Sequence, residues 1–266
     1  MSPDPNRGLV VEGLTVHYGR ATALTDVSVT APRGSVTAVV GPNGAGKSSL
    51  LLAIYGSVGS SGRVSVDGED MTRLKSIVRA RSGVAIVPQG RQIFPRLNVH
   101  DNLQVMAETL RLPNPAVDEA MDRFPILRER SRNLAGVLSG GEQQMLVVAR
   151  ALMSGPRVLL LDEMMTGLAP RIVQSLAGTV KELANDGVAV LLAEPSIGAL
   201  RGIIGRGYVV IRGNVIATEE GGGRLLDNAY QSAMGVELAK TVEAEAALEA
   251  AAQNGGPSEA NQAVRR

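Results

Sequence analysis

The sequence contains no cysteine and no tryptophan, and aromatic residues make up only 2% of its 266 positions. The lack of cysteine excludes a disulfide framework, thiol catalysis and cysteine-ligated metal sites. Because aromatic side chains are scarce, the core must consist of Val, Leu, Ile, Ala and Met, and few residues can stack on a nucleobase. A chain of this length can still bury a sizeable core, as one large α/β domain or two small ones.

The sequence also has no excess of either charge, since 27 basic and 26 acidic residues give a formal net charge of +1. A nucleic-acid surface normally shows as a basic excess, so we expect no nucleic-acid partner. No apolar run approaches the roughly 20 residues that a membrane-spanning helix needs, and no N-terminal signal pattern is present. These features favour a cytoplasmic protein.

A glycine-rich stretch, GPNGAGKSS at 41–49, follows an apolar run and precedes the helix-like segment SLLLAIYG. This order predicts a strand, a loop and a helix whose N-terminal backbone N–H groups face a phosphate chain. Lys47 would reach the terminal phosphates, and the Ser48 hydroxyl would ligate Mg²⁺. The glycines at 41, 44 and 46 would let the backbone approach the anion and supply positive φ angles. The alternative, an ordinary glycine turn, is disfavoured by the strand and helix on either side.

Two carboxylates end another apolar run, RVLLLDE at 157–163. Continuous apolarity predicts a strand buried on both faces of a parallel sheet, and the carboxyl ends of such strands are where α/β proteins bind ligands. We expect Asp162 to hold Mg²⁺, directly or through water, and Glu163 to polarise an attacking water. The alternative is a pair of solvated acids at a strand end.

Two weaker signals accompany these motifs. The stretch LSGGEQQ at 138–144 places a serine and two glycines at a helix N-terminus, which could bind a second anion but, taken alone, is more typical of a plain capping turn. Tyr18 ends a predicted strand upstream of the glycine loop, where it could stack on a nucleobase or simply pack.

The rest of the chain divides by composition. We expect residues 1–8 to be disordered and 91–137 to form a helical insertion with apolar positions at helical spacing over 99–110. A further helix is expected to start with Asn114 as its cap and Pro115 in its first turn. Residues 235–266 read as an Ala/Glu-rich tail, partly helical or disordered. Other strands are expected within 9–16, 23–34, 62–70, 84–87, 188–193, 208–211 and 215–218, and a helix over 170–185.

Tyr18, GPNGAGKSS, Gln89, LSGGE and VLLLDE, in this order and spacing, resemble the nucleotide-binding subunit of an ABC transporter over about residues 10–218. VPQGRQIFPRLNVHDNL, LAGVLSGGEQQML and GLAP are further similar to the short ATPase subunits of branched-chain amino acid importers, with urea and amide importers close to them. The resemblance implies an α/β fold of the P-loop NTPase (RecA-like) type, with an antiparallel β subdomain and an α-helical subdomain. The ABC ATPase domain would span 9–234.

The resemblance also implies ATP and Mg²⁺ as cofactors, and a head-to-tail dimer with a second ABC ATPase subunit that encloses two ATPs. Glu163 and Gln89 would act in hydrolysis, and Ser48, Gln89 and Asp162 would hold the metal. Tyr18 would stack on adenine. One chain would contribute Tyr18, Gly41, Pro42, Asn43, Gly44, Ala45, Gly46, Lys47, Ser48 and Ser49 to each nucleotide site, and the other Ser139, Gly140, Gly141 and Glu142.

The implied function is to energise uptake of branched-chain or other hydrophobic amino acids at the cytoplasmic face of the cell membrane. Membrane permease subunits would dock on the helical subdomain, and a periplasmic or extracellular substrate-binding protein would take part indirectly. Three alternatives stay open: an importer of urea or short amides, a catalytically weak regulatory partner, and an ABC ATPase of DNA repair or translation. The last class usually carries long insertions or tandem cassettes, which this sequence lacks.

The sequence departs from the family pattern at three places. Pro195 stands after Glu194 where a His or Gln is common, and proline has no side-chain donor for a γ-phosphate. Met164 and Met165 replace the usual Pro and Ser or Thr. Ala169–Pro170 stands where many ABC proteins have a Leu-Asp pair, although Ala-Pro is usual in the branched-chain subgroup. By analogy with loss of one oxyanion donor, Pro195 would slow the chain's own site about 10²- to 10³-fold, within an asymmetric heterodimer. The alternative is that Gln89 and Glu163 suffice.

Overall fold

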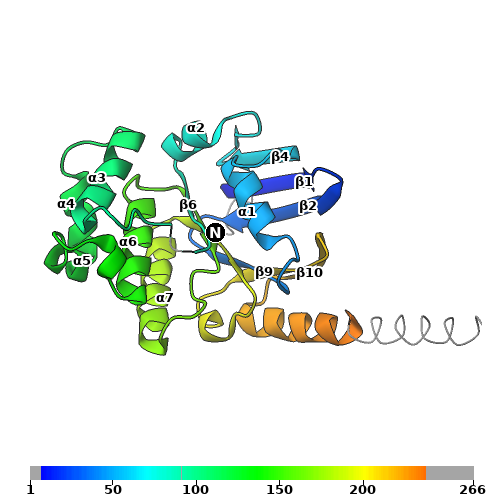
Figure 1. Ribbon diagram of the computed structural model, residues 1–266. Helices are drawn as coiled ribbons and strands as arrows, with labels where there is room; N and C mark the ends of the chain where they lie inside the picture. The colour runs from blue at the N-terminus through cyan, green and yellow to red at the C-terminus, as the bar shows by residue number, and fades with distance from the viewer. Residues whose placement is uncertain (1–6, 91, 238–266) are drawn as a thin grey trace, which may run out of the picture.

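The computed structural model describes residues 7–90 and 92–237, which form two β-sheets and a set of helices (Figure 1). The strands are β1 (Gly8–Tyr18), β2 (Ala21–Pro32), β3 (Val36–Val40), β4 (Ser61–Val66), β5 (Glu69–Asp70), β6 (Val84–Val87), β7 (Val158–Asp162), β8 (Ala189–Glu194), β9 (Arg206–Ile211) and β10 (Asn214–Glu219). The helices are α1 (Lys47–Tyr55), α2 (Ser76–Arg81), α3 (Val99–Leu110), α4 (Ala116–Arg123), α5 (Pro125–Glu129), α6 (Gly140–Leu152) and α7 (Pro170–Asn185), with 3₁₀ turns at Ala135–Val137 and Gly198–Leu200.

The central sheet has the order β10-β9-β3-β8-β7-β6, and its members are parallel except for β10. Strands β3, β7 and β8 are buried at every position, and because successive side chains point to opposite sides, both faces of the sheet are covered there, whereas the edge strand β10 is partly exposed. In β7, Leu159 and Leu161 join one core with α6 and α7, whereas Val158 and Leu160 join a second core with α1. The buried parallel strand predicted from RVLLLDE is confirmed.

A second, antiparallel sheet has the order β2-β1-β4-β5. Its apolar face shares the second core with α1, where Leu50, Leu51 and Ile54 are fully buried. β4 and β5 are joined at Asp67 and Gly68, whose φ angles of 51° and 82° are those of a tight hairpin turn. The antiparallel subdomain expected from the family resemblance is therefore present.

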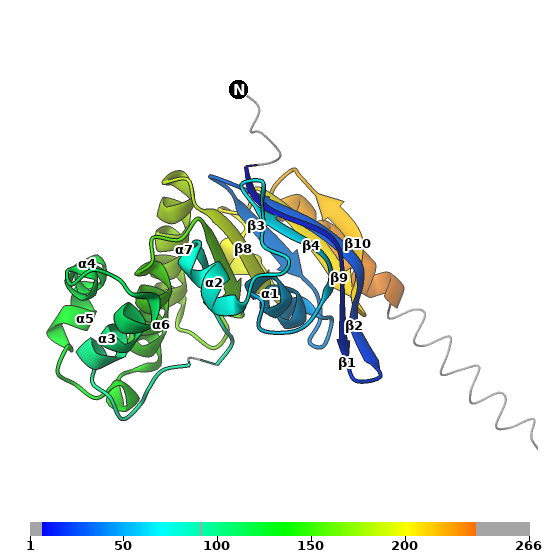
Figure 2. The same cartoon turned by 90° about the horizontal axis from the view of Figure 1, so that it is seen from above.

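Helices α3, α4 and α5 lie together at one end of the molecule, away from both sheets (Figures 1 and 2). The expected helix over 99–110 is confirmed and is capped by Asn98, which accepts a hydrogen bond from the Asp101 N–H. The start of α4 was predicted wrongly: Pro115 is the N-cap residue, and no side chain caps the helix. Helix α6 packs on α3, α4, α5 and β6, so it joins this helical part to the central sheet.

The ends of the expected domain also differ from the prediction. β1 begins at Gly8, whose N–H donates to Asp67, so this residue belongs to the sheet. A helix over 223–237 lies beside β9 and β10, and Leu226 is fully buried there. The expected disorder at 1–6 and the tail at 238–266 lie outside the described residues. Helix α2 was missed because it is a short segment rich in arginine. In the part of the chain that is described, no helix is both long and apolar enough to cross a bilayer.

Candidate functional site

The glycine-rich loop at 41–46 connects β3 to α1, as predicted. Gly44 and Gly46 have φ angles of 79° and 105°, which L side chains rarely adopt. Gly41 is needed for a different reason, because a Cβ atom there would lie 2.0 Å from the Val210 carbonyl oxygen of β9. Helix α1 has no side-chain cap at Gly46, so the N–H groups of its first turn open toward the loop.

Lys47, the first residue of α1, folds back over the loop. Its ammonium group donates to the carbonyl oxygens of Gly41 and Pro42 at 2.9 and 3.1 Å and lies 3.9 Å from the Glu163 carboxylate. The side chain is 4% exposed, and burial lowers the pKa of its amine, which the nearby carboxylates partly offset. Lys47 therefore places a buried positive charge at the mouth of the loop.

The two carboxylates at the end of β7 face this loop. Asp162 accepts a hydrogen bond of 3.0 Å from the Ser48 hydroxyl, and Glu163 accepts one of 2.7 Å from the Gln89 side chain. Asp162 is only 4% exposed, and burial raises its pKa. A buried carboxyl group held against a P-loop hydroxyl is not a solvated acid at a strand end. That alternative is therefore excluded for Asp162.

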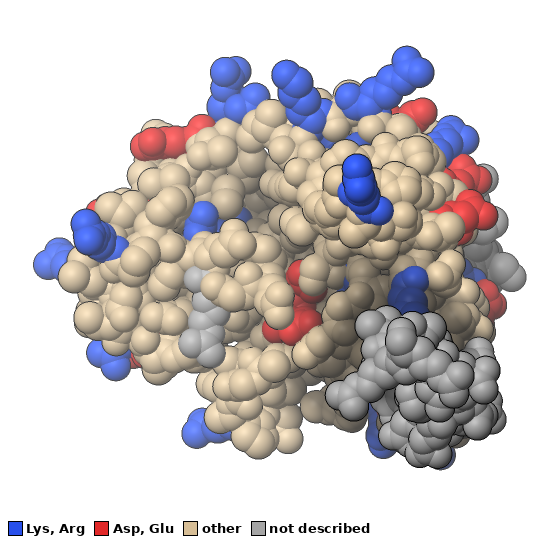
Figure 3. Space-filling model, turned by 45° about the vertical axis from the view of Figure 1, so that its right-hand side comes forward, with Lys and Arg blue, Asp and Glu red and all other residues tan. Residues whose placement is uncertain are grey.

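Lys47, Ser48, Gln89 and Glu163 line one cavity of about 450 Å³. Tyr18 stands at its rim and is 48% exposed. A second cavity, of about 480 Å³, adjoins it through Gln89 and Glu163 and reaches Gln143 and Gln144 of α6. The face drawn in Figure 3 shows acidic side chains in a central hollow and others along its edges, with lysines and arginines spread around the hollow. The first cavity is lined by Tyr18, Ala23, Asn43, Gly44, Gly46, Lys47, Ser48, Ser49, Gln89 and Glu163.

The donor set at this cavity fits Mg²⁺. The ion prefers oxygen ligands and is usually held by one or two protein groups together with substrate phosphates and waters. Ser48 and Asp162 already place a hydroxyl and a carboxylate oxygen 3.0 Å apart, and Gln89 lies across the cavity. A triphosphate wrapped by the loop would supply the remaining oxygens. The arrangement suits phosphoryl transfer, with charge stabilised by Lys47 and the metal.

The predicted second anion element, at the start of α6, does not line this cavity. Ser139 is the N-cap, and its hydroxyl accepts from the Glu142 N–H while the Glu142 carboxylate accepts from the Ser139 N–H at 2.7 Å. Arg130 also lies 3.3 Å from the Glu142 carboxylate. The structure thus contains the capping turn that the sequence allowed. The N–H groups of Gly140 and Gly141 still open the helix, where no intrahelical partner exists.

The structure adds a carboxyl group that the sequence analysis noted only as the neighbour of Pro195. Glu194 ends β8, is 3% exposed and accepts a hydrogen bond of 3.1 Å from the Met165 N–H. Burial raises its pKa to about 7. Its position gave a signal, since it ends an apolar strand as Asp162 does. Pro195 follows it with no side-chain donor, as the sequence implies.

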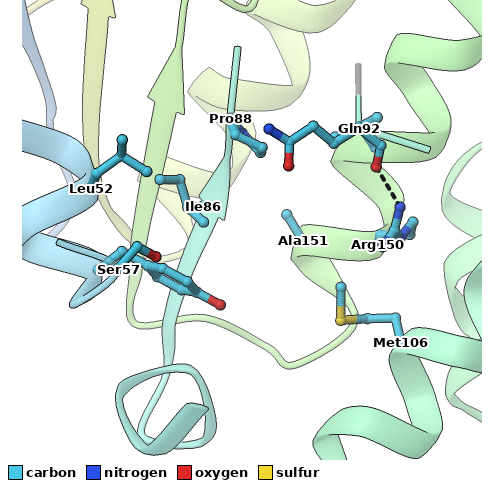
Figure 4. Close-up of a pocket in the computed structure, with 10 residues that line it drawn as sticks. Leu52, Ser57, Ile86, Pro88, Gln92, Met106, Arg150 and Ala151 are labelled. Carbon is cyan, nitrogen blue, oxygen red and sulfur yellow. Dashed lines mark hydrogen bonds between the residues drawn. The ribbon is translucent and has the colours of Figure 1, made fainter. Parts of the chain in front are cut away.

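Arg150 was also not singled out from the sequence. Its guanidinium donates to the Gln92 carbonyl oxygen at 2.7 Å and lies 5.0 Å from the centre of the Phe94 ring, so it ties α6 to the segment that follows Gln89. It lines a groove of about 240 Å³ between the central sheet and the helical part (Figure 4). Leu52 and Ile86 form one wall, and Met106 and Ala151 belong to the opposite helices.

Comparison with known proteins agrees with this geometry. Residues 24–166 match the model of the ABC transporter family. The chain is 39% identical over 216 residues to the high-affinity branched-chain amino acid transport ATP-binding protein BraG of Pseudomonas aeruginosa, covering 80% of this chain and 93% of that protein. It is 34% identical to the lipopolysaccharide export system ATP-binding protein LptB of Haemophilus influenzae, over 79% and 89%. A solved ATP-binding cassette of an ABC transporter in its ADP conformation superposes with a TM-score of 0.76 at 28% identity, over 86% and 97%.

Proposed function

This chain belongs to the ABC transporter family, as an ATP-binding subunit and ATPase, and we propose that it energises uptake of branched-chain or other hydrophobic amino acids. The observation that carries the ATPase assignment is the convergence of Lys47, Ser48, Gln89 and Glu163 on one cavity, with Asp162 behind Ser48. The similarity to BraG supports the amino-acid substrate. The similarity to LptB shows that related subunits also serve export systems, so the substrate rests on the transport test below.

The chemistry follows from where each side chain lies. The triphosphate would displace Lys47 from the Gly41 and Pro42 carbonyls, and its charge would replace those contacts with stronger ones. Mg²⁺, held by Ser48, Asp162 and Gln89, would neutralise charge that develops on the β- and γ-phosphates. Glu163 would orient and polarise the attacking water, and Tyr18 would stack on adenine at the rim of the cavity.

The start of α6 would serve a partner's nucleotide. Ser139, Gly140 and Gly141 lie outside the cavity of their own chain, and an α6 N-terminus suits a γ-phosphate. A head-to-tail dimer with a second ABC ATPase subunit would complete two such sites. The Glu142 carboxylate, predicted to belong to this element, holds the Ser139 N–H. Its contribution would therefore be to shape the turn.

The groove in Figure 4 would receive a segment of a membrane permease. It lies between the central sheet and the helical part and is tied to the Gln89 segment through Arg150, so a permease could sense nucleotide there. The chain would then sit at the cytoplasmic face of the membrane. A substrate-binding protein would act on the other side, without touching this chain.

Two measurements test this function. Mg²⁺-dependent ATP hydrolysis by the chain, alone and mixed with its cognate partner ATPase, is expected to exceed that of Glu163→Gln. Uptake of labelled leucine is expected to fail in cells without the chain and to return with the wild type. Hydrolysis with normal leucine uptake in the deletion strain would overturn the amino-acid substrate, and labelled urea then tests the amide alternative.

Docking at the groove is tested with a matched pair of arginine substitutions. Ser57 is exposed and lines the groove, whereas Ser60 is exposed outside it. Ser57→Arg is expected to abolish co-purification with the permease and to keep basal hydrolysis, while Ser60→Arg keeps both. Equal co-purification by the two variants would contradict the assignment of the groove.

Pro195 favours a second candidate, a subunit whose own site turns over slowly in an asymmetric heterodimer. Proline cannot bridge to a γ-phosphate, so the site built on Lys47 would mainly hold nucleotide. The start of α6 would meanwhile complete the partner's faster site. Pro195→His is expected to raise the heterodimer's rate. An unchanged rate would show that Gln89 and Glu163 suffice.

A further inference from the structure

Glu194 is an unusual group for its position. Its carboxyl group is 3% exposed at the carboxyl end of β8, and no ion pair within 4.0 Å is found for it among the described residues. Burying a carboxyl group without a cation is costly, and a neutral acceptor would satisfy a backbone N–H at less cost. Such a group beside a catalytic centre is a candidate for a functional role.

Glu194 forms a hydrogen bond with Met165, which lies two residues after Glu163. Glu194 Oε1 accepts from the Met165 N–H at 3.1 Å, and the preceding residue, Ala193, accepts from the Glu163 N–H at 2.9 Å through its carbonyl oxygen. Two successive residues of β8 therefore hold two N–H groups of the segment that leaves β7. Met164, between them, is buried.

The segment needs such anchors because Glu163 is in a disfavoured conformation. Its φ angle is 45°, in the left-handed region, and a non-glycine residue there costs on the order of 1 kcal/mol or more. The surrounding structure must hold it. The side chain of Glu163 is directed to Gln89, and this direction depends on the backbone conformation. Loss of the anchor at Met165 would let the segment relax and turn Glu163 away from the cavity.

We propose that Glu194 is a positioning residue for Glu163, holding the segment 163–165 through the Met165 N–H so that the Glu163 carboxylate faces the nucleotide. The inference rests on the proposed role of Glu163 in hydrolysis. It assigns to Glu194 a function separate from that of Pro195, which has no donor to offer. Glu194 itself does not line the cavity that Lys47, Ser48 and Glu163 line.

Three substitutions test this role in the full chain, in the dimer that turns over ATP. Glu194→Leu fills a similar volume without an acceptor, Glu194→Asp withdraws the acceptor by one methylene, and Glu194→Gln keeps an acceptor oxygen. We expect Leu and Asp to lower kcat about 10-fold or more, with the KM for ATP and binding of a fluorescent ATP analogue within about 3-fold. Gln is expected to keep kcat within about 3-fold of the wild type.

A double variant separates positioning from general damage. If Glu194 acts through Glu163, Glu163→Gln/Glu194→Leu is no slower than Glu163→Gln alone, because the two losses are not additive. Full kcat in Glu194→Asp, equal losses in Leu and Gln, or additive losses in the double variant would overturn the proposal. If Glu163→Gln itself retains full turnover, the proposed role of Glu163 fails instead. If Glu163→Gln loses turnover and Glu194→Leu keeps the wild-type kcat, only the inference about Glu194 is overturned.

Discussion

Helices α1 and α6 both begin after small residues, and both N-termini are suited to phosphate, yet their surroundings differ. At α1, Gly46 provides no side-chain cap, and Lys47 and Ser48 occupy the first turn. At α6, Ser139 and Glu142 cap each other. The first helix therefore begins in a cavity that contains a cation and carboxylates, and the second begins in a self-contained turn.

The difference between the two helix N-termini indicates which parts of a nucleotide site a single chain provides. In the proposed function the α1 end supplies a positive charge for the phosphates, oxygens for a metal and a carboxylate that would polarise water, so one chain would bind the nucleotide through this end. The α6 end offers N–H groups and a hydroxyl, which stabilise charge but carry out no proton transfer. The α6 N-terminus would therefore contribute to hydrolysis only when a partner subunit places its bound nucleotide against it.

The largest expected effect contrasts an acid at each end. Glu163→Gln removes the group proposed to polarise the attacking water, and the loss of a general base is expected to lower kcat about 10²- to 10⁴-fold. Glu142→Gln is expected to change kcat less than about 3-fold, because glutamine also completes a capping box. Steady-state hydrolysis in the active dimer measures both, with ATP binding as the check that the Glu163 variant still loads nucleotide. Similar losses in the two variants would erase the distinction between the helices.

A glycine pair tests the same distinction through the backbone. Alanine at Gly46 would place Cβ 2.6 Å from the Ala23 carbonyl oxygen, at a φ angle of 105°. Gly46→Ala is therefore expected to weaken nucleotide binding by the isolated chain about 100-fold or more, since the loop can no longer take its shape. At Gly141 the added Cβ meets only the Ile172 side chain at 3.1 Å, which can move. Binding by Gly141→Ala equal to wild type, measured by fluorescence titration, is the matching expectation.

The sequence was informative about the α1 end because its signals are local. The strand, loop and helix follow one another in the chain, and the acids of β7 end an apolar run that predicts a buried parallel strand. The different requirement at Gly41 was not predictable, since it depends on the Val210 carbonyl of β9, which is remote in sequence. The start of the tail, predicted from composition at residue 235, likewise falls inside a helix, and Leu226 of that helix is buried on the sheet.

The α6 end was harder to interpret from the sequence. Ser139 and two glycines before a helix fit both a cap and an anion site, and the structure shows the cap without excluding the site. Glu194 illustrates the other limit. Its hydrogen bond to the Met165 N–H joins the end of β8 to the segment that leaves β7, and these become neighbours only after β7 and β8 pair, so no local pattern could assign this contact.

A smaller effect concerns how the stability of the folded chain depends on pH through Glu194. The folded pKa of Glu194 is about 7, above its ordinary value of 4.5, so the folded chain binds this proton more tightly than the unfolded chain. The free energy of unfolding therefore falls as pH rises from about 4.5 through 7, by roughly 3 kcal/mol at 1.36 kcal/mol per pKa unit. Glu194→Gln is expected to remove the part of this slope that Glu194 contributes in nucleotide-free denaturant titrations, and to leave the part from Asp162, whose pKa burial also raises. The exposed control Glu182→Gln keeps the whole slope, and an unchanged slope in Glu194→Gln would contradict the assigned pKa.

The smallest expected change in stability comes from the loss of the cap on α6. Ser139→Ala removes the hydroxyl that accepts from the Glu142 N–H, which costs about 1 kcal/mol and lowers the melting temperature by about 2 °C. Because Ser139 lies outside its own chain's cavity, nucleotide binding by the isolated variant is expected to equal that of the wild type. A dimer that pairs Ser139→Ala with Lys47→Ala then keeps one complete site, made from the intact Lys47 of the first chain and the intact Ser139 of the second. If α6 acts on the partner's nucleotide, we expect turnover in this mixture and little turnover in either variant alone. An inactive mixture would show that the N-terminus of α6 is only a structural cap.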